Sequence, residues 1–394
     1  MNYTLTLNLG SSSLKFSVFN KEFNEVLNGS YERIGVDGLL KYKFDSKKEK
    51  ESIELKNHND ALNNLLELLK KLEIKKDDIK VIAHRVVHGG EKYSKPTILT
   101  KEVVKDLKNY SYLAPLHNPN NIKGIEIALN KFNAKNIAIF DTAFHSTIPK
   151  TNFMYSLPKK IYDEYSVRKY GFHGSSHQYI ATKLKEMNVS GNKHIICHLG
   201  NGSSITALKN FKSFNNSMGL TPLDGVIMGT RVGSIDPGVI LFLLDNGFSK
   251  DEVDKILNKK SGLLGLSGKN SVKDLYESDK SIENVENIHK TDNDSNELFT
   301  MKCLVNSISS IIGSYVAQLS GIDGIAFTGG IGENAWYIRR LVLKQLSYLG
   351  IDIDNEANQK NELIITKEDS NVKSYVIETN EELMMAKIAN NFIS

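Results

Sequence analysis

The stretch NLGSSSLK at Asn8–Lys15 lies between two runs whose apolar residues alternate with the period of a β-strand. Residues 3–9 lead into this stretch and residues 14–18 lead out of it, so the pattern predicts a β-hairpin. Its tip carries a glycine, three serines and a lysine. Gly10 lets the backbone approach a ligand closely, and the turn amides, the hydroxyl groups and the Lys15 ammonium group favour phosphate oxygens. Taken alone, the stretch is equally compatible with an ordinary polar turn.

Two further glycine-rich turns also indicate binding of phosphate groups. His194–Leu208 repeats the plan, because an apolar strand enters, a Leu-Gly pair opens a Gly/Ser turn and an apolar strand leaves. Phe327–Asn334 reads FTGGIGEN, follows the apolar run 322–327 and precedes a helical pattern at 336–346. Glycines between a strand and a helix N-terminus let a nucleotide approach the backbone and the positive end of the helix. The three turns in this order predict two similar half-molecules that bind one polyphosphate.

The rest of the chain alternates between strand and helix patterns, which indicates an α/β protein. The expected elements are helices at 59–72 and 122–130, strands at 81–87 and 137–140, a surface excursion at 279–296 and a closing helix at 381–393. Asp141 directly follows the strand at 137–140. Its carboxylate is therefore expected at the carboxyl edge of a sheet, where open α/β sheets hold ligands.

Composition excludes several classes of protein. A chain of 394 residues with 40% hydrophobic and 24% charged residues is long enough for two globular domains. The net charge of +4 is small and lysines alternate with acidic residues, so we expect no nucleic-acid partner. No apolar run approaches the ~20 residues of a membrane span, so no membrane partner is expected. Two isolated cysteines and a start without a basic, apolar leader favour a reduced, cytoplasmic protein.

Five more motifs accompany the glycine turns. They are HRVVHGG at 84–90, PLHNP at 115–119, FDTAFH at 140–145, YGFHGSSH at 170–177 and MGTR at 228–231. With these motifs the chain closely resembles the acetate kinase family, within the larger group of sugar kinases, actin and heat-shock chaperone ATPases. The resemblance extends from Leu5 to the segment 379–382. No GxxxxGK[ST] motif occurs, which argues against a P-loop kinase.

The resemblance implies an α/β fold of two ribonuclease-H-like (actin-like ATPase) domains with an interdomain cleft. The first domain is expected at 1–145 plus 382–394, with the closing helix packed back on it. The second is expected at 146–381 and carries the nucleotide-binding turns. The family also implies a homodimer.

Transfer of a phosphoryl group from ATP to a carboxylate brings two anions together, so the site needs fixed positive charge. A simple carboxylic acid has a pKa of roughly 4 to 5 and is already ionised near neutrality, which leaves little for a general base to do. By resemblance, Arg85 contacts the acyl substrate and Arg231 stabilises the transferring phosphoryl group, since arginine binds such groups with two N–H donors. The alternative for each arginine is a structural ion pair.

Three oxygen-bearing residues match family positions near the metal and the reacting groups. Asp141 matches the active-site aspartate and is expected to orient Mg²⁺-bound water and substrate; its alternative is a strand-end cap. Asn8 and Glu381 match positions near the metal, which we expect to be Mg²⁺ with Mn²⁺ as a substitute. Glu381 is also compatible with a first-turn glutamate of the closing helix.

Two histidine pairs, His84/His88 and His173/His177, have a spacing that can bind zinc on a helix. Neither pair has the glutamate of an HExxH motif, so a zinc hydrolase is the third-ranked alternative. By resemblance, His173 stabilises the transition state by donating to the moving phosphoryl group. His58 lies in a polar stretch and is expected to be exposed.

The resemblance also assigns the residues that bind the two substrates. With Arg85, the acyl group is expected to contact Val87, Leu116, His117, Phe172 and Pro222. The nucleotide is expected to contact Ser11, Ser13, Lys15, His198, Leu199, Gly200, Asn201, Gly202, Ser271, Val272, Lys273, Gly330, Ile331, Gly332, Glu333 and Asn334. One methylene group in an apolar pocket changes binding by only ~1–3 kcal/mol, so propionate is expected to be a poorer, usable substrate.

The chain departs from the family pattern near the expected adenosine site. Residues 266–273 read LSGKNSVK, and a one-residue deletion places Ser271 and Lys273 where the family usually has Asp and Arg. A lysine supplies a point charge without the planar fork or the stacking of arginine. The preference among ATP, GTP and other donors is therefore open.

The implied activity is reversible, Mg²⁺-dependent, direct in-line transfer of a phosphoryl group from ATP to acetate, giving acetyl phosphate and ADP. A propionate or butyrate kinase of the same family is the nearest alternative. A nucleotide-driven switch, like actin or a chaperone ATPase, is an alternative of a different class. That alternative leaves Arg85, Arg231 and the apolar pocket unused.

Overall fold

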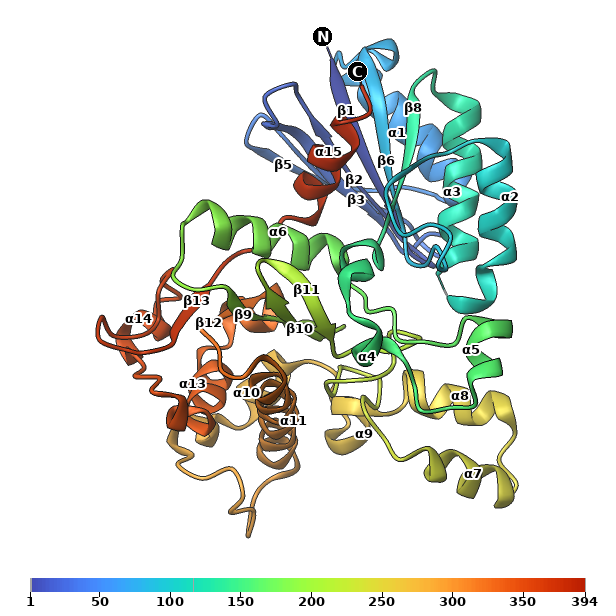
Figure 1. Ribbon diagram of the computed structural model, residues 1–394. Helices are drawn as coiled ribbons and strands as arrows, with labels where there is room; N and C mark the ends of the chain where they lie inside the picture. The colour runs from blue at the N-terminus through green and yellow to red at the C-terminus, as the bar shows by residue number, and fades with distance from the viewer. Residues whose placement is uncertain (1, 116, 394) are drawn as a thin grey trace. The chain divides into compact units, whose positions relative to one another are not determined.

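The computed structural model describes residues 2–115 and 117–393, which form two compact units. Unit 1 is Met1–Phe144 with Asn380–Ser394, and unit 2 is His145–Thr379. Each unit contains one β-sheet flanked by helices (Figure 1). Among the described residues, no helix combines the length and the hydropathy needed to cross a bilayer.

Unit 1 is built on an eight-stranded sheet in the order β5-β4-β3-β2-β1-β6-β8-β7. Strands β1 to β5 form an antiparallel meander, whereas β1, β6 and β8 run parallel. The strands are β1 Tyr3–Leu9, β2 Leu14–Phe19, β3 Glu25–Glu32, β4 Leu39–Phe44, β5 Lys47–Ser52, β6 Ile79–Val86, β7 Thr97–Ile98 and β8 Lys135–Phe140. The first predicted hairpin is confirmed, with Leu9 paired to Leu14 at its tip.

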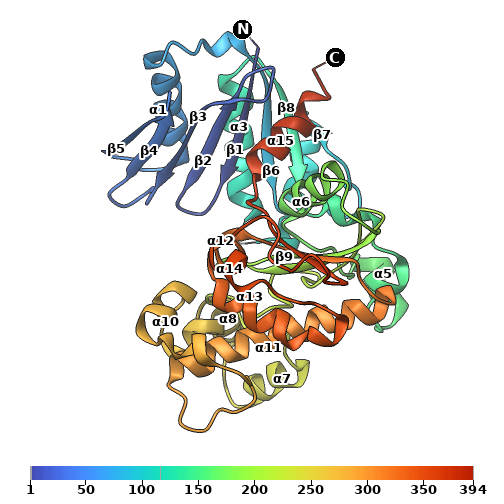
Figure 2. The ribbon, with the colours of Figure 1, turned by 90° about the vertical axis from the view of Figure 1, so that its left-hand side faces the viewer.

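Helices cover both faces of the parallel part of this sheet (Figure 2). They are α1 His58–Lys71, α2 Lys101–Asn109, α3 Asn118–Lys131 and α15 Glu381–Asn390. Alternation within β6 explains the two layers: Ile82 packs in the core with α1, whereas its neighbours Val81 and Ala83 pack against Met385 of α15. Helix α15 thus packs on the sheet of unit 1, and β8 ends directly before Asp141.

Unit 2 is built on a five-stranded sheet in the order β11-β10-β9-β12-β13. The strands are β9 Lys193–His198, β10 Ser204–Lys209, β11 Lys212–Asn216, β12 Gly324–Thr328 and β13 Lys373–Val376. Strand β9 pairs antiparallel with β10 and parallel with β12, as β1 pairs antiparallel with β2 and parallel with β6. The predicted second hairpin and the repetition of a half-molecule are confirmed.

Most of the helices belong to unit 2. They are α4 Lys150–Phe153, α5 Lys159–Tyr165, α6 Gly174–Glu186, α7 Pro237–Asp245, α8 Lys250–Lys259, α9 Gly262–Ser267, α10 Val272–Ser278, α11 Asn296–Leu319, α12 Gly329–Asn334, α13 Trp336–Gln345 and α14 Asn355–Gln359. Short 3₁₀ turns lie at Lys76–Asp78, Ser111–Leu113, Ala143–Thr147, Lys280–Asn284 and Ser347–Leu349. The long helix α11 and helix α13 pack together in the core of the unit.

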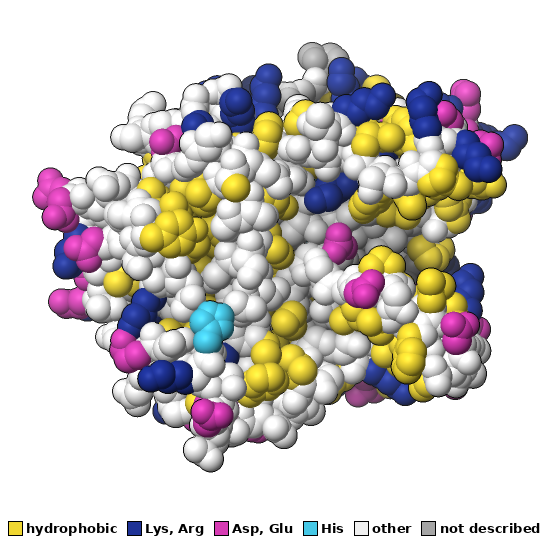
Figure 3. Space-filling model, turned by 60° about the horizontal axis from the view of Figure 1, so that its bottom comes forward, with side chains coloured by type: hydrophobic (Ala, Val, Ile, Leu, Met, Phe, Trp, Pro, Cys, Tyr) yellow, Lys and Arg dark blue, Asp and Glu magenta, His cyan; other side chains and the backbone are white. Residues whose placement is uncertain are grey.

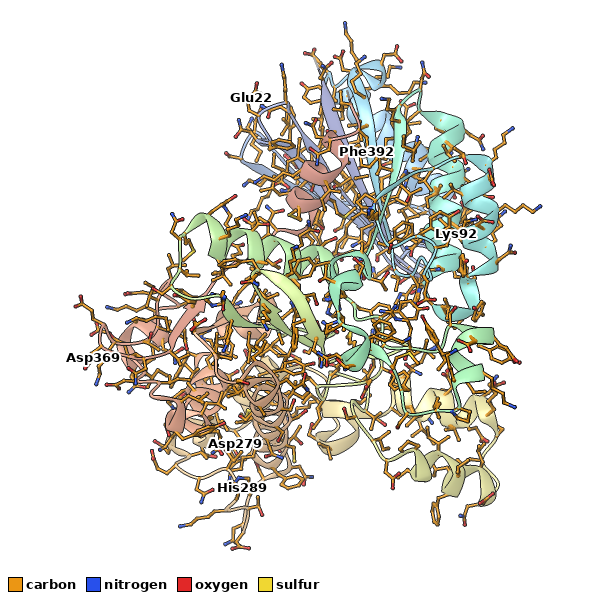
Figure 4. All side chains as sticks on the ribbon, in the orientation of Figure 1. Glu22, Lys92, Asp279, His289, Asp369 and Phe392 are labelled. Atoms are coloured by element: carbon orange, nitrogen blue, oxygen red, sulfur yellow. The ribbon has the colours of Figure 1, made fainter. Side chains whose placement is uncertain are left out.

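The expected surface excursion at 279–296 is only partly a surface segment. Its outer end near His289 is exposed (Figure 4), but Ile282, Val285 and Ile288 are buried in the core of unit 2. A buried ion pair holds its far end, because Lys302 Nζ of α11 lies 2.7 Å from Asp294 Oδ2. Most of the segment is exposed as expected, and three apolar residues anchor it to the core of unit 2.

Candidate functional site

Arg85 and Asp141 form a two-point ion pair at the carboxyl edge of the sheet of unit 1. Arg85 lies near the end of β6, and Asp141 follows its parallel neighbour β8, so the strand register brings the two side chains together. Arg85 Nε donates to Asp141 Oδ1 and Arg85 Nη2 donates to Asp141 Oδ2, both at 2.8 Å. The Asp141 side chain is 3% exposed and that of Arg85 is 21% exposed. Burial alone would lower the pKa of Arg85, but Asp141 and more weakly Glu381 and Glu382 raise it above its ordinary value.

More charged and polar groups gather at the same edge of unit 1. Glu381 begins helix α15, and its pKa is raised mainly by burial and also by Asp141, whereas Arg85 and Lys15 oppose the rise. Lys15 is paired across the first hairpin with Asn8. The structure thus brings Asn8, Lys15, Arg85, Asp141 and Glu381 into one region of the unit. Amide and carboxylate oxygens of this kind suit Mg²⁺, which keeps several waters and needs few protein ligands.

The tip of the first hairpin rests on the start of α1. Gly10 N donates to Ser13 O at 2.9 Å, and a Cβ atom on Gly10 would lie 2.7 Å from Ser13 Oγ. His58 Nε2 lies 2.8 Å from Gly10 O and His58 is buried, so the expectation of an exposed His58 is wrong. The carbonyl oxygen can only accept, so His58 carries its proton on Nε2. Ser11 is exposed and Ser13 is partly exposed at this tip.

The residues expected around the acyl group belong to different units. Val87 is buried in unit 1, where its N–H donates to Asn121 Oδ1, and His117 precedes α3. Phe172 and Pro222 belong to unit 2, and Phe172 is buried. The expectation for Leu116 lies outside the described residues.

In unit 2, His173 and Arg231 both approach the second glycine turn. A Cβ atom on Gly202 would lie 3.3 Å from His173 Nε2 and 3.8 Å from Arg231 Nη1. Arg231 Nη1 also donates to Pro222 O at 2.9 Å, which directs the guanidinium group. His198 ends β9, and its ring centroid lies 4.6 Å from that of His173. Imidazole and guanidinium donors therefore converge on a glycine turn of the kind that binds phosphate oxygens.

The third glycine turn packs directly on the second. Leu199 O accepts hydrogen bonds from Ile331 N at 2.9 Å and Gly332 N at 3.2 Å. Gly329 has φ +75° and a Cβ atom there would lie 2.7 Å from Leu199 O, so only glycine fits this close approach. Glu333 Oε1 accepts from Gly329 N at 2.8 Å and from Thr379 N at 3.1 Å. The Glu333 carboxylate thus connects the start of this turn to Thr379 through two hydrogen bonds.

A cavity of about 820 Å³ in unit 2 adjoins these turns. It is lined by eight of the residues expected to bind the nucleotide, which are Gly200, Asn201, Ser271, Val272, Lys273, Gly330, Ile331 and Asn334. Three aromatic residues that the sequence did not single out, Tyr276, Trp336 and Tyr337, also line it. The rings of Tyr276 and Tyr337 are stacked, with centroids 4.0 Å apart and an interplanar angle of 7°. Trp336 belongs to the helical pattern predicted at 336–346, and no pattern pointed to Tyr276.

The two residues that depart from the family pattern have local structural partners. Ser271 caps α10, because its side chain accepts from Asp274 N. Lys273 Nζ lies 3.7 Å from Glu277 Oε1 one helical turn later, and both side chains are mostly exposed. Exposed pairs of this type are weak, so Lys273 can exchange Glu277 for an anionic ligand at small cost.

Arg339 donates hydrogen bonds to the backbone of the third glycine turn. Its side chain is fully buried, with Nη1 donating to Gly332 O and Glu333 O at 2.9 Å. The remaining nitrogens donate to Asn358 and Asn361. All five acceptors are neutral oxygens, and burial lowers the pKa of Arg339 to about 10. The carbonyls at the end of α12 are thereby fixed by a buried cation, which suits the negative end of a helix dipole.

His84 is expected to make unit 1 sensitive to acid. Its Nε2 lies 2.7 Å from Asn136 Oδ1, while Nδ1 is buried with no hydrogen-bond partner among the described residues. Burial lowers the pKa of His84 to about 4. In the unfolded chain the His84 ring takes up a proton below about pH 6.5, whereas in the folded chain it does so only near pH 4. The free energy of unfolding therefore has its full value above about pH 6.5 and decreases as the pH falls toward 4.

We therefore expect His84→Gln, which keeps a donor for Asn136, to flatten the pH dependence of unfolding. Between pH 7.5 and pH 5.5 the wild-type chain should lose about 1.4 kcal/mol relative to the variant. Calorimetric melting at the two pH values measures this difference. Parallel pH dependence of the two proteins would show that His84 titrates alike in the folded and unfolded states.

Comparison with known proteins identifies one family. Residues 3–387 match the model of the acetokinase family. An acetate kinase from Clostridium beijerinckii is 44% identical over 400 residues, covering 97% of this chain and 98% of the relative. Among solved structures, a propionate kinase from Francisella tularensis has a TM-score of 0.91 at 36% identity, covering 99% and 100% of the two chains. An acetate kinase from Porphyromonas gingivalis has a TM-score of 0.89 at 32% identity, with both chains fully covered. The predicted two-domain, actin-like ATPase fold is thereby confirmed.

Proposed function

Because the chain belongs to the acetokinase family, we propose that it catalyses the reversible transfer of the γ-phosphoryl group of ATP to acetate, giving acetyl phosphate and ADP. The full-length similarity to acetate kinases is the observation that carries this function. The arrangement of charged side chains supports it, since each unit supplies donors suited to one of the two anionic substrates.

Arg85 is proposed to bind the carboxylate of acetate. A guanidinium group has five N–H donors, of which Asp141 accepts two. The two-point contact fixes the plane of the guanidinium group and leaves donors that match a carboxylate. Asp141 therefore acts by orienting Arg85, and acetate needs no general base because it is already ionised.

Arg231 and His173 are proposed to bind the phosphoryl group during transfer. Both lie next to Gly202, where the backbone admits close approach of phosphate oxygens. In a loose transition state the transferring group carries its charge on equatorial oxygens, and preorganised donors stabilise that charge directly. Tyr276, Trp336 and Tyr337 are proposed to line the site of the nucleotide base, with Ser271, Val272 and Lys273 beside it.

A divalent cation, Mg²⁺ or Mn²⁺, is proposed to associate with Asn8 and Glu381. These residues fit such an ion because both offer oxygen donors, and because a cation would lower the raised pKa of partly buried Glu381. When bound, the ion neutralises phosphate oxygens of the nucleotide. Both oxygens of Asp141 are hydrogen-bonded to Arg85, so Asp141 is proposed to act on ordered water rather than as a direct ligand.

Trapping the acyl phosphate with hydroxylamine tests this function. The purified protein should form hydroxamate only when both acetate and ATP are present. Comparing the rates of hydroxamate formation with acetate, propionate and butyrate, each with ATP and with GTP, also identifies the preferred acid and the preferred nucleotide. The similarity to a propionate kinase makes propionate the main competitor, and a faster rate with propionate would reassign the substrate. ATP hydrolysis without hydroxamate would instead favour a nucleotide switch.

We propose that the protein works in the cytoplasm. Cys197 and Cys303 are free thiols, and Cys197 is buried. Unpaired cysteines are usual where thiols are kept reduced.

Helix α7 is proposed to form the interface of a homodimer. Its sequence is PGVILFLLD, and none of its residues is buried in the single chain. Exposed fractions reach 63% for Leu241 and 65% for Phe242, and Val239, Leu244 and Phe248 are also exposed. Figure 3 shows exposed hydrophobic side chains at several places on the face that it draws. Several exposed apolar side chains on and next to one helix favour contact with another protein, and a second copy is the proposed partner.

We expect the double variant Leu241→Glu, Phe242→Glu to be a monomer and the wild-type chain to be a dimer. Charges placed in an apolar interface are desolvated without a partner, which opposes association. Sedimentation equilibrium at micromolar concentration measures the mass of each. Val36→Glu, at an exposed apolar residue of unit 1, is the matched control and should stay dimeric. A monomeric wild-type chain would refute the proposal.

A further inference from the structure

Ser204 lies between two histidine rings in unit 2. It is the first residue of β10, directly after the second glycine turn, and it is fully buried. Its Oγ is 3.0 Å from His173 Nδ1 and 2.7 Å from His177 Nε2. His177 lies one turn further along α6 than His173, so both rings project toward the same hydroxyl group.

The single proton of Ser204 decides the direction of both hydrogen bonds. When the hydroxyl group donates to one imidazole nitrogen, it must accept an N–H from the other. Two arrangements therefore satisfy both contacts. If Ser204 donates to His173 Nδ1, both neutral rings carry their proton on Nε2. If Ser204 donates to His177 Nε2, both rings carry their proton on Nδ1.

His177 distinguishes the two arrangements. Its Nδ1 is buried and has no hydrogen-bond partner among the described residues. Burial, with smaller effects from His145 and His198, lowers the pKa of His177, so the ring is neutral. A proton on Nδ1 would be a buried donor without an acceptor, which costs about 1–3 kcal/mol. A bare nitrogen lone pair there costs less, since unsatisfied acceptors are better tolerated than unsatisfied donors.

It follows that His177 carries its proton on Nε2 and donates it to Ser204 Oγ. Ser204 then donates to His173 Nδ1, which leaves the proton of the neutral His173 ring on Nε2. This nitrogen is the one that approaches the Cβ position of Gly202.

The backbone of His173 is also held in an unusual conformation. Its φ of +57° is left-handed, and the residue stands at the N-cap of α6 without a side-chain capping bond. A non-glycine residue keeps such a strained conformation only where contacts with its surroundings hold it in place. The Ser204 contact is one such constraint, because it fixes the ring on the side of the glycine turn.

We propose that Ser204 and His177 are positioning residues for phosphoryl transfer, which hold His173 in the Nε2–H form so that this N–H points at the transferring phosphoryl group. The proposal rests on the proposed function of His173. Ser204 and His177 themselves do not touch the substrate, and their effect passes through the orientation and the tautomer of the His173 ring.

Kinetics of Ser204→Ala test the consequence for the reaction. We expect kcat to fall by about 10- to 100-fold, because a misdirected donor loses much of its transition-state interaction, while the KM values for acetate and ATP change little. Ser204→Thr keeps the hydroxyl group and should recover most of kcat. Ser213→Ala is the matched control, since it removes a buried hydroxyl group 2.8 Å from His145 Nδ1 without touching His173. An unchanged kcat in Ser204→Ala, or an equal loss in Ser213→Ala, would overturn the proposal.

Nitrogen NMR of the histidine rings tests the tautomer directly in the wild-type chain. Long-range ¹H–¹⁵N spectra of protein with labelled histidine distinguish a protonated Nε2 from a protonated Nδ1, and His173→Gln and His177→Gln assign the signals. We expect both rings to be Nε2–H forms, and His173 to become a tautomer mixture in Ser204→Ala. An Nδ1–H form of His173 in the wild-type chain would overturn the proposal. This readout needs no turnover, so it separates failure of the positioning proposal from failure of the proposed function.

Discussion

Replacing Asp141 with asparagine is expected to lower kcat for acetyl phosphate formation by about 10³-fold. The Asp141 carboxylate accepts from two nitrogens of Arg85 at 2.8 Å, and an asparagine amide offers only one acceptor. Its NH₂ group would face a guanidinium N–H, so Arg85 would turn away from the acyl substrate. Because an amide does not titrate, the loss should be the same at every pH. Initial rates from pH 6 to pH 9 measure it.

The chain offers a matched control for this variant. Arg33 Nε and Asp37 Oδ1 form an arginine–aspartate pair at 2.9 Å, but both side chains are more than half exposed. Exposed pairs contribute little to stability, and this one lies outside the proposed site. Asp37→Asn should therefore keep kcat within about twofold of the wild-type value. Full activity of Asp141→Asn would reject the orienting role of Asp141.

Replacing Arg339 with methionine is expected to destabilise unit 2 by about 3–5 kcal/mol. The guanidinium group donates five hydrogen bonds, all to neutral oxygens of Gly332, Glu333, Asn358 and Asn361. Methionine matches the apolar stem but leaves these buried acceptors without donors. Because Gly332 and Glu333 end the third glycine turn, the KM for ATP should also rise in any folded variant.

Urea unfolding monitored by tryptophan fluorescence measures this effect. The chain has one tryptophan, Trp336, and it begins α13 in unit 2, three residues before Arg339. Arg340→Met is the control on the same helix: Arg340 donates to the carbonyls of residues 282, 283 and 285 and is less completely buried. Its cost should be clearly smaller. Equal unfolding midpoints for Arg339→Met and the wild-type chain would contradict the buried-donor argument.

The parts of the site that could be predicted are those set by short segments. The two hairpins, with Gly10 and Gly202 near their tips, could be predicted from strand alternation and glycine positions. The glycine-rich segment after β12 could be located in the same way, although it forms the short helix α12 rather than a turn. Asp141 could be placed at a sheet edge because it follows a buried strand. The Arg85–Asp141 contact itself needed the parallel register of β6 and β8, which two separate segments do not disclose.

The parts that could not be predicted depend on contacts between distant segments. His58 reads as an exposed polar residue, yet it is buried because α1 packs under the first hairpin. Tyr276 contributes to the cavity of unit 2 only because α10 lies beside α13. Ser204 reads as one more serine of a glycine-rich turn, and only the fold places it between His173 and His177.

Periodicity and glycine content act over a few neighbouring residues, so they were enough to predict the α/β fold, the repeated half-molecule and the positions of the glycine-rich segments. Tertiary structure alone decided which side chains meet. It paired Arg85 with Asp141, gave Arg339 its buried acceptors and placed the hydroxyl group of Ser204 between two imidazole rings. Hydrogen bonds depend on distances of about 3 Å between atoms, and only the folded chain fixes such distances for residues far apart in sequence.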